Sequence, residues 1–438
     1  MKRLQLQHIY AGILIAIFGL IILHAPLSVF FGSTFPEYAL VIKAWKEILM
    51  AIAVPIAVIL LTRHQAWGKL LRDKLFWLII AYVGLHLVML VFSSGIDSAL
   101  AGLAIDLRYI VYFSLVYVLM LLYPVYQKAF FRVGIVGAVI VIVFALLQQF
   151  LPNGALTAIG YGPDTTSPYT TIDRNYDFVR HNSTLRGPNP LGAYAASVGV
   201  LLFAYVATRF TKDRSINWWI VGAGFLAALV TYLSYSRSAY VALAVGVAIV
   251  AVTVFGRRIR RWQWGVIVAS VVIVFAGLFA LTDNAIVSNI ILHEDPAESG
   301  KVNSNDEHLS SLQEGIGRMI EQPLGRGVGS TGSASLLTDD KIIIENQYLF
   351  IAHEVGWIGL AIFLAIFIIV LKRLWAQRAN LWALGLFASG IGLALIGILL
   401  PVWADDTVSI VWWGLAAILI AGGSNGTRPT NQKTTRTT

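Results

Sequence analysis

The chain has 438 residues, of which 58% are hydrophobic and only 13% are charged, and its mean hydropathy is +0.75. Soluble domains carry about 25% charged and roughly 45–50% apolar residues, so this composition excludes a soluble globular protein. The chain has no cysteine, which excludes disulfides, zinc–thiolate sites and thiol catalysis. The formal charge of +9 is better explained by basic loops between membrane spans than by nucleic acid binding.

Apolar segments of about 20 residues recur along the chain and predict an all-α, polytopic membrane protein. We expect about 12 transmembrane helices. Their expected bounds are about 9–31, 38–61, 76–93, 100–122, 133–151, 188–208, 217–234, 238–256, 264–281, 347–371, 379–400 and 405–422.

The spans divide the chain into a longer and a shorter membrane region separated by one large loop. Spans one to nine occupy 1–281 and include an external loop at about 152–187. The large extracytoplasmic loop is 282–346, spans ten to twelve lie within 347–422, and 423–438 is a polar tail that we expect to be disordered. Loops of this length are usually functional when they are not disordered.

The large loop is expected to be partly helical. Ser304 and Glu307 have the spacing of a capping box, and apolar residues follow them at helical spacing. Pro323 is expected to end this helix, and a tight turn follows at Gly325–Gly329. The helix either caps the membrane domain or forms a lid over a site, and the sequence leaves both interpretations open.

Basic residues are concentrated in one set of connections. Most of the 32 Lys and Arg residues lie in the N-terminal segment, in alternate loops and in the C-terminal tail, against only two acids there, Asp73 and Asp213. Short cytoplasmic loops carry this excess, so both termini are predicted to be cytoplasmic and the two long loops external. The basic run Arg257–Arg261 is interpreted as a stop-transfer signal that contacts anionic lipids.

Charged residues inside the spans mark candidate sites, because each costs at least about 2.5–3.5 kcal/mol on insertion scales. Lys43, Lys46 and Glu47 lie in the second span and Asp106 and Arg108 in the fourth. All five are expected roughly 8–14 Å below the outer membrane surface. Lys43 and Glu47 are four residues apart and can form an intrahelical pair, whereas Asp106 and Arg108 cannot face each other and each needs another partner.

Further charges gather at the same side of the membrane. Arg186 precedes the sixth span, Arg237 lies in the turn between the seventh and eighth, and Asp405 and Asp406 open the twelfth. Guanidinium groups bind phosphate oxygens through two parallel hydrogen bonds. A diphosphate-linked lipid entering from the outer leaflet is therefore a natural ligand for Arg108, Arg186 and Arg237.

Neither a cofactor nor a metal ion is expected. No pair of histidines has metal-ligand spacing with carboxylates nearby. His24 and His86 are interpreted as packing residues. The glycines at 325–329 do not form a nucleotide-binding loop, because no Lys-Ser or Lys-Thr pair follows them.

Three stretches carry a recognisable order of motifs. They are Thr184-Leu185-Arg186-Gly187-Pro188-Asn189-Pro190-Leu191-Gly192; Ser234-Tyr235-Ser236-Arg237-Ser238-Ala239; and Pro323-Leu324-Gly325-Arg326-Gly327-Val328-Gly329 with Glu345-Asn346-Gln347-Tyr348-Leu349 and Glu354-Val355-Gly356-Trp357-Ile358-Gly359-Leu360. Together they resemble the O-antigen ligase and polymerase superfamily of bacterial envelope glycosyltransferases. The order of the motifs, the number of spans and the position of the large loop all fit.

The resemblance implies a GT-C-like membrane fold in the bacterial cytoplasmic membrane. It implies transfer of a glycan, without a metal ion, from an undecaprenyl-diphosphate-linked oligosaccharide to an acceptor hydroxyl on the outer face. The acceptor is a glycan, a lipid or a protein, and the enzyme sits among membrane lipids. Arg186 and Arg237 fall on functional arginines of the family. Ligases that attach O-antigen to lipid A core carry His where this chain has Glu345, which favours a polymerase.

Glu345 is the candidate general base. A carboxylate at a dry interface can accept the acceptor proton while arginines stabilise the departing diphosphate. The alternative is that Glu345 only caps the tenth span. The remaining charged and amide residues of these regions are assigned to substrate binding: Arg108, Asn189, Arg326, Asn346, Lys43 and Lys46.

A transporter or lipid-linked glycan flippase is the competing class. Such proteins tend to have internal repeats and charges near the membrane midplane. The sequence has no convincing repeat, and its intramembrane charges lie on one side only. Polymerase and ligase are separated only by the Glu345 argument.

Overall fold

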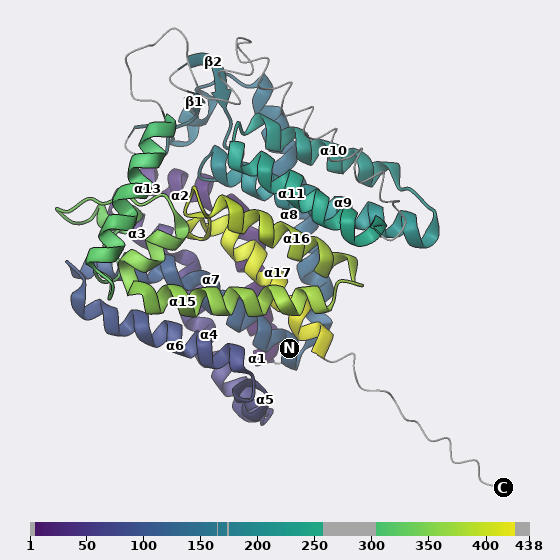
Figure 1. The fold of residues 1–438 in the computed structure, drawn as a ribbon, viewed down its shortest axis with the longest axis horizontal. Coiled ribbons are helices and arrows are strands. Elements are labelled where there is room, and N and C mark those ends of the chain that lie inside the picture. The colour runs from purple at the N-terminus through teal and green to yellow at the C-terminus, as the bar shows by residue number, and fades with distance from the viewer. Residues whose placement is uncertain (1–4, 164, 173–174, 257–303, 425–438) are drawn as a thin grey trace.

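The computed structural model describes residues 5–163, 165–172, 175–256 and 304–424 (Figure 1). The first half contains α1 (Leu6–Leu20), η1 (Ile21–Leu23), α2 (His24–Thr34), η2 (Pro36–Tyr38), α3 (Ala39–Lys43), α4 (Trp45–Arg63), α5 (Trp67–Leu71), α6 (Lys74–Met89), η3 (Leu90–Phe92), α7 (Ile96–Leu122), η4 (Pro124–Tyr126), α8 (Gln127–Leu147), η5 (Gln148–Phe150), η6 (Ala155–Ile159), β1 (Thr170–Ile172) and β2 (Asn175–Arg180). The second half contains α9 (Pro188–Asp213), α10 (Trp218–Leu233), α11 (Arg237–Phe255), α13 (Ser304–Glu321), α14 (Gly332–Ser335), α15 (Gln347–Ala376), α16 (Leu381–Ile396), η8 (Val402–Ala404) and α17 (Asp406–Ser424).

The described residues include eight helices or helical runs that are long and apolar enough to cross a membrane. Three shorter apolar helices, α10, α16 and α17, accompany them. Together they coincide with the expected spans except 264–281, which lies outside the described residues. The protein is thus mostly helical and multi-spanning, as its composition predicts, while the full count of 12 stays a prediction.

The second expected span begins later than its hydropathy indicates. The sequence predicts one helix from about 38, but the chain forms η2 and α3 first and breaks at Ala44, whose backbone is not helical. Trp45 then starts α4. Hydropathy reports only apolarity, which is the same on both sides of this break.

The membrane helices pack in two groups joined by α17. An aromatic cluster on α7, α15 and α17 fills the centre of the first group, where Trp413 lies 5.5 Å from Tyr109 and 5.7 Å from Phe113 between ring centroids. Trp403 in η8 and Trp413 in α17 are both almost fully buried. Offset and edge-to-face aromatic contacts of this kind add stabilisation beyond the area they bury.

Small residues bring α9, α11 and α16 close together in the second group. A Cβ atom added at Gly246 on α11 would lie 2.5 Å from Val200 on α9, and one at Gly392 on α16 would lie 2.9 Å from the Ala242 carbonyl oxygen. Helices in membranes associate through such small-residue contacts, because lipid supplies little hydrophobic driving force between them. The close packing fixes where the ends of these helices lie.

The connection at 152–187 contains structure that the sequence did not predict. After η6, β1 and β2 form an antiparallel ribbon that pairs Thr170 with Arg180 and Thr171 with Val179. The ribbon leads directly into α9, so Arg180 and Arg186 are held near the start of that helix.

The described part of the large loop agrees with the expectation. A helix, α13, does run from Ser304 to Glu321, two residues before Pro323. Gly325, Gly327 and Gly329 then have positive φ angles of 88°, 103° and 80°, as a tight glycine turn requires. The side chains of the capping box lie outside the described residues, as does the loop before 304.

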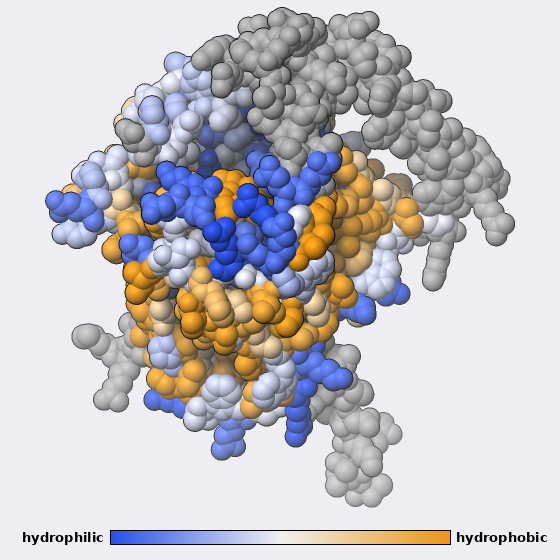
Figure 2. All heavy atoms as spheres, turned by 60° about the vertical axis from the view of Figure 1, so that its left-hand side comes forward, coloured by the Kyte–Doolittle hydropathy of each residue, from blue (hydrophilic) through white to orange (hydrophobic). Residues whose placement is uncertain are grey.

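The two ends of the helical bundle differ. In Figure 1 the long helices α6, α9, α11 and α15 run across the view, and α13 and the ribbon lie toward the left-hand end. Figure 2 turns that end forward and shows hydrophilic residues gathered there above a surface dominated by hydrophobic residues. This is the end that the charge bias of the loops predicts to be external.

Candidate functional site

A cavity of about 370 Å³ lies where several membrane helices end. Its walls come from the start of α9, the segment 332–345, the end of α16 and residues 400–405. The lining contains both apolar and polar side chains. The polar ones are Arg186, Asn189, Ser333, Glu345 and Asp405. Glu345 therefore shares one cavity with Arg186 and Asn189, which lie more than 150 positions earlier in the chain.

Arg186 is placed by the start of α9. Proline is favoured at the first position of a helix, and Pro188 begins α9 there. Arg186, two residues earlier, is solvent-exposed, and its Nη2 donates a hydrogen bond to Ser333 Oγ at 3.0 Å. This bond connects the start of α9 to the segment that follows the glycine turn.

A second arginine, missed in the sequence, joins Asn189 to the turn before Arg237. Arg180 at the end of β2 donates from Nη2 to Asn189 Oδ1 at 2.6 Å and from Nε to the Ser234 carbonyl at 3.1 Å. Arg237, three residues after Ser234, begins α11 and is partly buried. It does not line the cavity itself. Only the ribbon places Arg180 here, and nothing in the local sequence signals it.

Glu345 and Asn346 have different positions at the start of α15. Asn346 is the N-cap, with its Oδ1 accepting from the backbone N–H groups of Tyr348 and Leu349 at 2.8 and 3.0 Å. Its Nδ2 donates to the Ile398 carbonyl at 2.7 Å. The N-cap of α15 is therefore Asn346 rather than Glu345. Glu345 is partly buried and lines the cavity instead.

Arg108 and Lys46 belong to a buried charge network beside the cavity. Arg108 donates to the Ala404 carbonyl at 2.7 Å and forms an ion pair with Asp406. Lys46 lies 3.2 Å from Glu47 and 3.5 Å from Asp406. Neither cation lines the cavity, although Ala404 and Asp405 do. As the sequence required, Arg108 and Asp106 have separate partners.

The two histidines interpreted as packing residues are both in polar contacts. His24 Nε2 lies 2.8 Å from Asp406 Oδ2, and its Nδ1 accepts from Trp45 Nε1 at 3.0 Å. His86 is buried 3.8 Å from Asp106. Sequence alone did not show these contacts, because their partners are 20 to 382 residues away.

Lys43 and Arg326 lie away from the cavity lining. The Lys43 side chain is exposed, and Lys46 rather than Lys43 pairs with Glu47. Arg326 forms an ion pair with Asp340. Their assignment to substrate binding stays a prediction that this geometry does not support.

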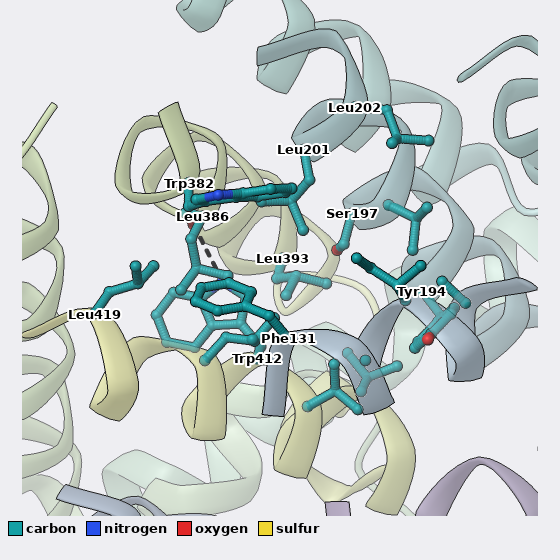
Figure 3. A pocket seen from close by; sticks show the side chains of 17 residues that line it. Phe131, Tyr194, Ser197, Leu201, Leu202, Trp382, Leu386, Leu393, Trp412 and Leu419 are labelled. Atoms are coloured by element: carbon teal, nitrogen blue, oxygen red, sulfur yellow. Dashed lines mark hydrogen bonds between the residues drawn. The ribbon is translucent and has the colours of Figure 1, made fainter. Parts of the chain in front are cut away.

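A second cavity, of about 120 Å³, lies among α8, α9, α16 and α17 (Figure 3). Its walls are aromatic and aliphatic, including Phe131, Trp382 and Trp412, with Ser197 and Tyr194 among the few polar groups. Figure 3 shows no cluster of charged side chains around it. The cavity lacks groups for proton transfer or phosphate binding, so the chemistry is assigned to the first cavity.

Within the described part of the chain, no group of three or more His, Asp or Glu side chains is arranged to hold a metal ion.

Residues 222–364 match the family model described as O-antigen ligase. The match supports the resemblance of this chain to the O-antigen ligase and polymerase superfamily. The matched region includes Arg237, Arg326 and Glu345, whereas Arg186 and Asn189 precede it. No curated protein matches the chain.

Similarity to the O-antigen ligase family points to a bacterial membrane protein and to a lipid-linked glycan as its substrate. The cavity suits such a substrate, because it is lined by both polar and apolar side chains. The family model thus confirms the resemblance to this superfamily that the sequence motifs indicate.

Proposed function

We propose that the protein transfers a glycan from an undecaprenyl diphosphate carrier to an acceptor hydroxyl at the outer face of the bacterial cytoplasmic membrane. The main support is the cavity that brings Glu345 together with Arg186 and Asn189 from a distant part of the chain. It offers a cation for the diphosphate and a carboxylate for the acceptor. Because these groups lie at the ends of membrane helices, a lipid carrier can reach them while its chain stays in the bilayer.

In the proposed reaction, the Glu345 carboxylate removes the proton of the acceptor hydroxyl. The acceptor oxygen attacks the anomeric carbon of the donor sugar as the bond from that carbon to the diphosphate oxygen breaks, with inversion. Both bonding electrons leave with the diphosphate, whose developing charge Arg186 stabilises. The same role for Arg237, which does not line the cavity, stays a prediction. Fixed guanidinium groups supply the charge stabilisation that a metal ion provides in other phosphate sites.

We further propose that the enzyme is a polymerase rather than a lipid A core ligase. The support is chemical: the family's ligase histidine is replaced by Glu345, which lines the cavity. In a polymerase the acceptor is a second lipid-linked glycan, so the product is a ladder of lengths. A ligase makes one transfer to a different lipid or protein.

The test uses purified protein, a lipid-diphosphate oligosaccharide and product sizing on gels. We expect a ladder that disappears in Arg186→Ala and Glu345→Gln. Arg378→Ala and Glu321→Gln are matched controls, because both side chains are exposed and absent from the cavity lining. One transfer to an added acceptor, without a ladder, would establish a ligase. Movement of intact donor between the leaflets of a proteoliposome, without transfer, would establish a flippase.

A further inference from the structure

A buried pair of carboxyl groups lies beside the site without a role in the reaction above. Glu354 on α15 is 1% exposed and Asp106 on α7 is 6% exposed. Asp106 Oδ2 and Glu354 Oε2 receive no N–H or O–H donor from the described residues.

Glu354 is bound to the backbone of the glycine turn and of the segment that follows it. Its Oε1 accepts the Thr331 N–H at 3.3 Å, and its backbone carbonyl accepts the Gly327 N–H at 3.1 Å. Both contacts join α15 to this segment, and Asp106 makes neither of them.

The glycine turn is wedged between the elements that carry these acids. A Cβ atom at Gly329 would lie 2.1 Å from the Ser98 carbonyl oxygen of α7, and one at Gly325 would lie 2.6 Å from the Gly356 nitrogen of α15. α15 is kinked at Gly356, whose φ is 70°. The turn is therefore closely packed against both helices, and Glu354 binds the segment directly after it.

Thr331 connects this anchored turn to both sides of the cavity. Its Oγ1 donates to the Ile342 carbonyl at 3.1 Å and accepts the Ile344 N–H at 3.2 Å, and Ile344 directly precedes Glu345. Two residues after Thr331, Ser333 Oγ accepts the hydrogen bond from Arg186. One residue thus links the acid pair to the proposed base and to the partner of the proposed phosphate-binding arginine.

We propose that Glu354 is a positioning residue that holds Glu345 and Arg186 in place relative to each other through Thr331. This inference rests on the proposed transfer reaction and extends it. A displacement of about 1 Å in a reacting group can cost a factor of about 100 in rate. Loss of the Glu354 carboxyl is therefore expected to lower mainly kcat, because Arg186 remains available to bind the diphosphate.

The experiment compares three substitutions in the full-length protein. Glu354→Ala should lower kcat about 100-fold while the KM for the lipid-linked donor changes less than threefold. Asp106→Asn should stay within about threefold of the wild-type kcat, because the Thr331 N–H bonds to Glu354 and not to Asp106. Glu354→Gln should retain most of the activity, since its side-chain carbonyl still accepts the Thr331 N–H.

A fourth variant keeps the test informative if Glu354→Ala does not fold. Thr331→Val preserves the N–H bonded to Glu354 but removes Oγ1, and should lower kcat at unchanged KM. Amide hydrogen exchange over 331–345, measured without substrate, should be faster in Glu354→Ala and Thr331→Val and unchanged in Asp106→Asn. Normal kcat in both Glu354→Ala and Thr331→Val would overturn the inference. Absence of transfer by the wild-type enzyme would instead overturn the proposed function, and the exchange data would still report on the positioning contacts.

Discussion

The ion pair between Arg108 and Asp406 is expected to stabilise the bundle rather than bind substrate. The two side chains are 5% and 14% exposed. Removing one member of a buried pair costs about 3–5 kcal/mol, because the other charge is left without compensation. Asp406 keeps Lys46 at 3.5 Å and His24 at 2.8 Å, so Arg108→Met should lie near the lower end, at about 3 kcal/mol. Asp406→Asn should cost a similar amount.

The assay is a double-mutant cycle read by thermal unfolding in detergent, with size-exclusion chromatography to check folding. Combining Arg108→Met with Asp406→Asn should cost less than the sum of the single changes, by about 1–3 kcal/mol. The exposed pair Arg209 and Asp213 is the control, and its cycle should show no measurable coupling. Additive effects at Arg108 and Asp406 would refute the reasoning. Unchanged stability in Arg108→Met together with lost donor binding would place Arg108 in the substrate site.

Two further predictions concern stability alone. Asp73 caps α6 and receives two hydrogen bonds from Arg373, at 2.5 and 2.7 Å; partial burial opposes ionisation, but these bonds prevail and lower its pKa. Asp73→Asn should therefore destabilise the protein by about 1–2 kcal/mol above pH 5. This difference should shrink as the pH falls through the folded-state pKa of Asp73. The measurement is the unfolding temperature of both proteins as a function of pH. Gly329→Ala should lower the free energy of unfolding by at least about 3 kcal/mol, because of backbone strain and the clash with Ser98. Gly317→Ala is the control: the new methyl group has open space around it, so the unfolding temperature should stay unchanged or rise. Equal effects at the two glycines would contradict this prediction.

The membrane helices could be predicted from sequence because burial in lipid imposes long apolar segments directly. The glycine turn was also predictable, since residues with positive φ have a local signal in glycine. The break at Ala44 was not, because alanine is the strongest helix former and gives no local signal of a helix end. The ribbon of β1 and β2 was missed because its strands are too short for their alternation to stand out.

The site was predictable only in part. Arg186, Asn189 and Glu345 lie on one cavity as expected of a shared site, and their chemical roles stay predictions. Arg326 was expected with them, but Asp340 binds it elsewhere. The link made by Thr331 could not be predicted, because it depends on how a loop folds back against α15.

The claim that matters most is that one cavity performs glycan transfer with Glu345 as base. The most direct measurement is single-turnover transfer from a radiolabelled lipid-diphosphate oligosaccharide by the purified wild-type enzyme and by Glu345→Gln, with donor binding measured in parallel. We predict that donor binding is equal in the two proteins and that the transfer rate falls by at least about 100-fold in the variant. Near-normal transfer by Glu345→Gln would contradict the account.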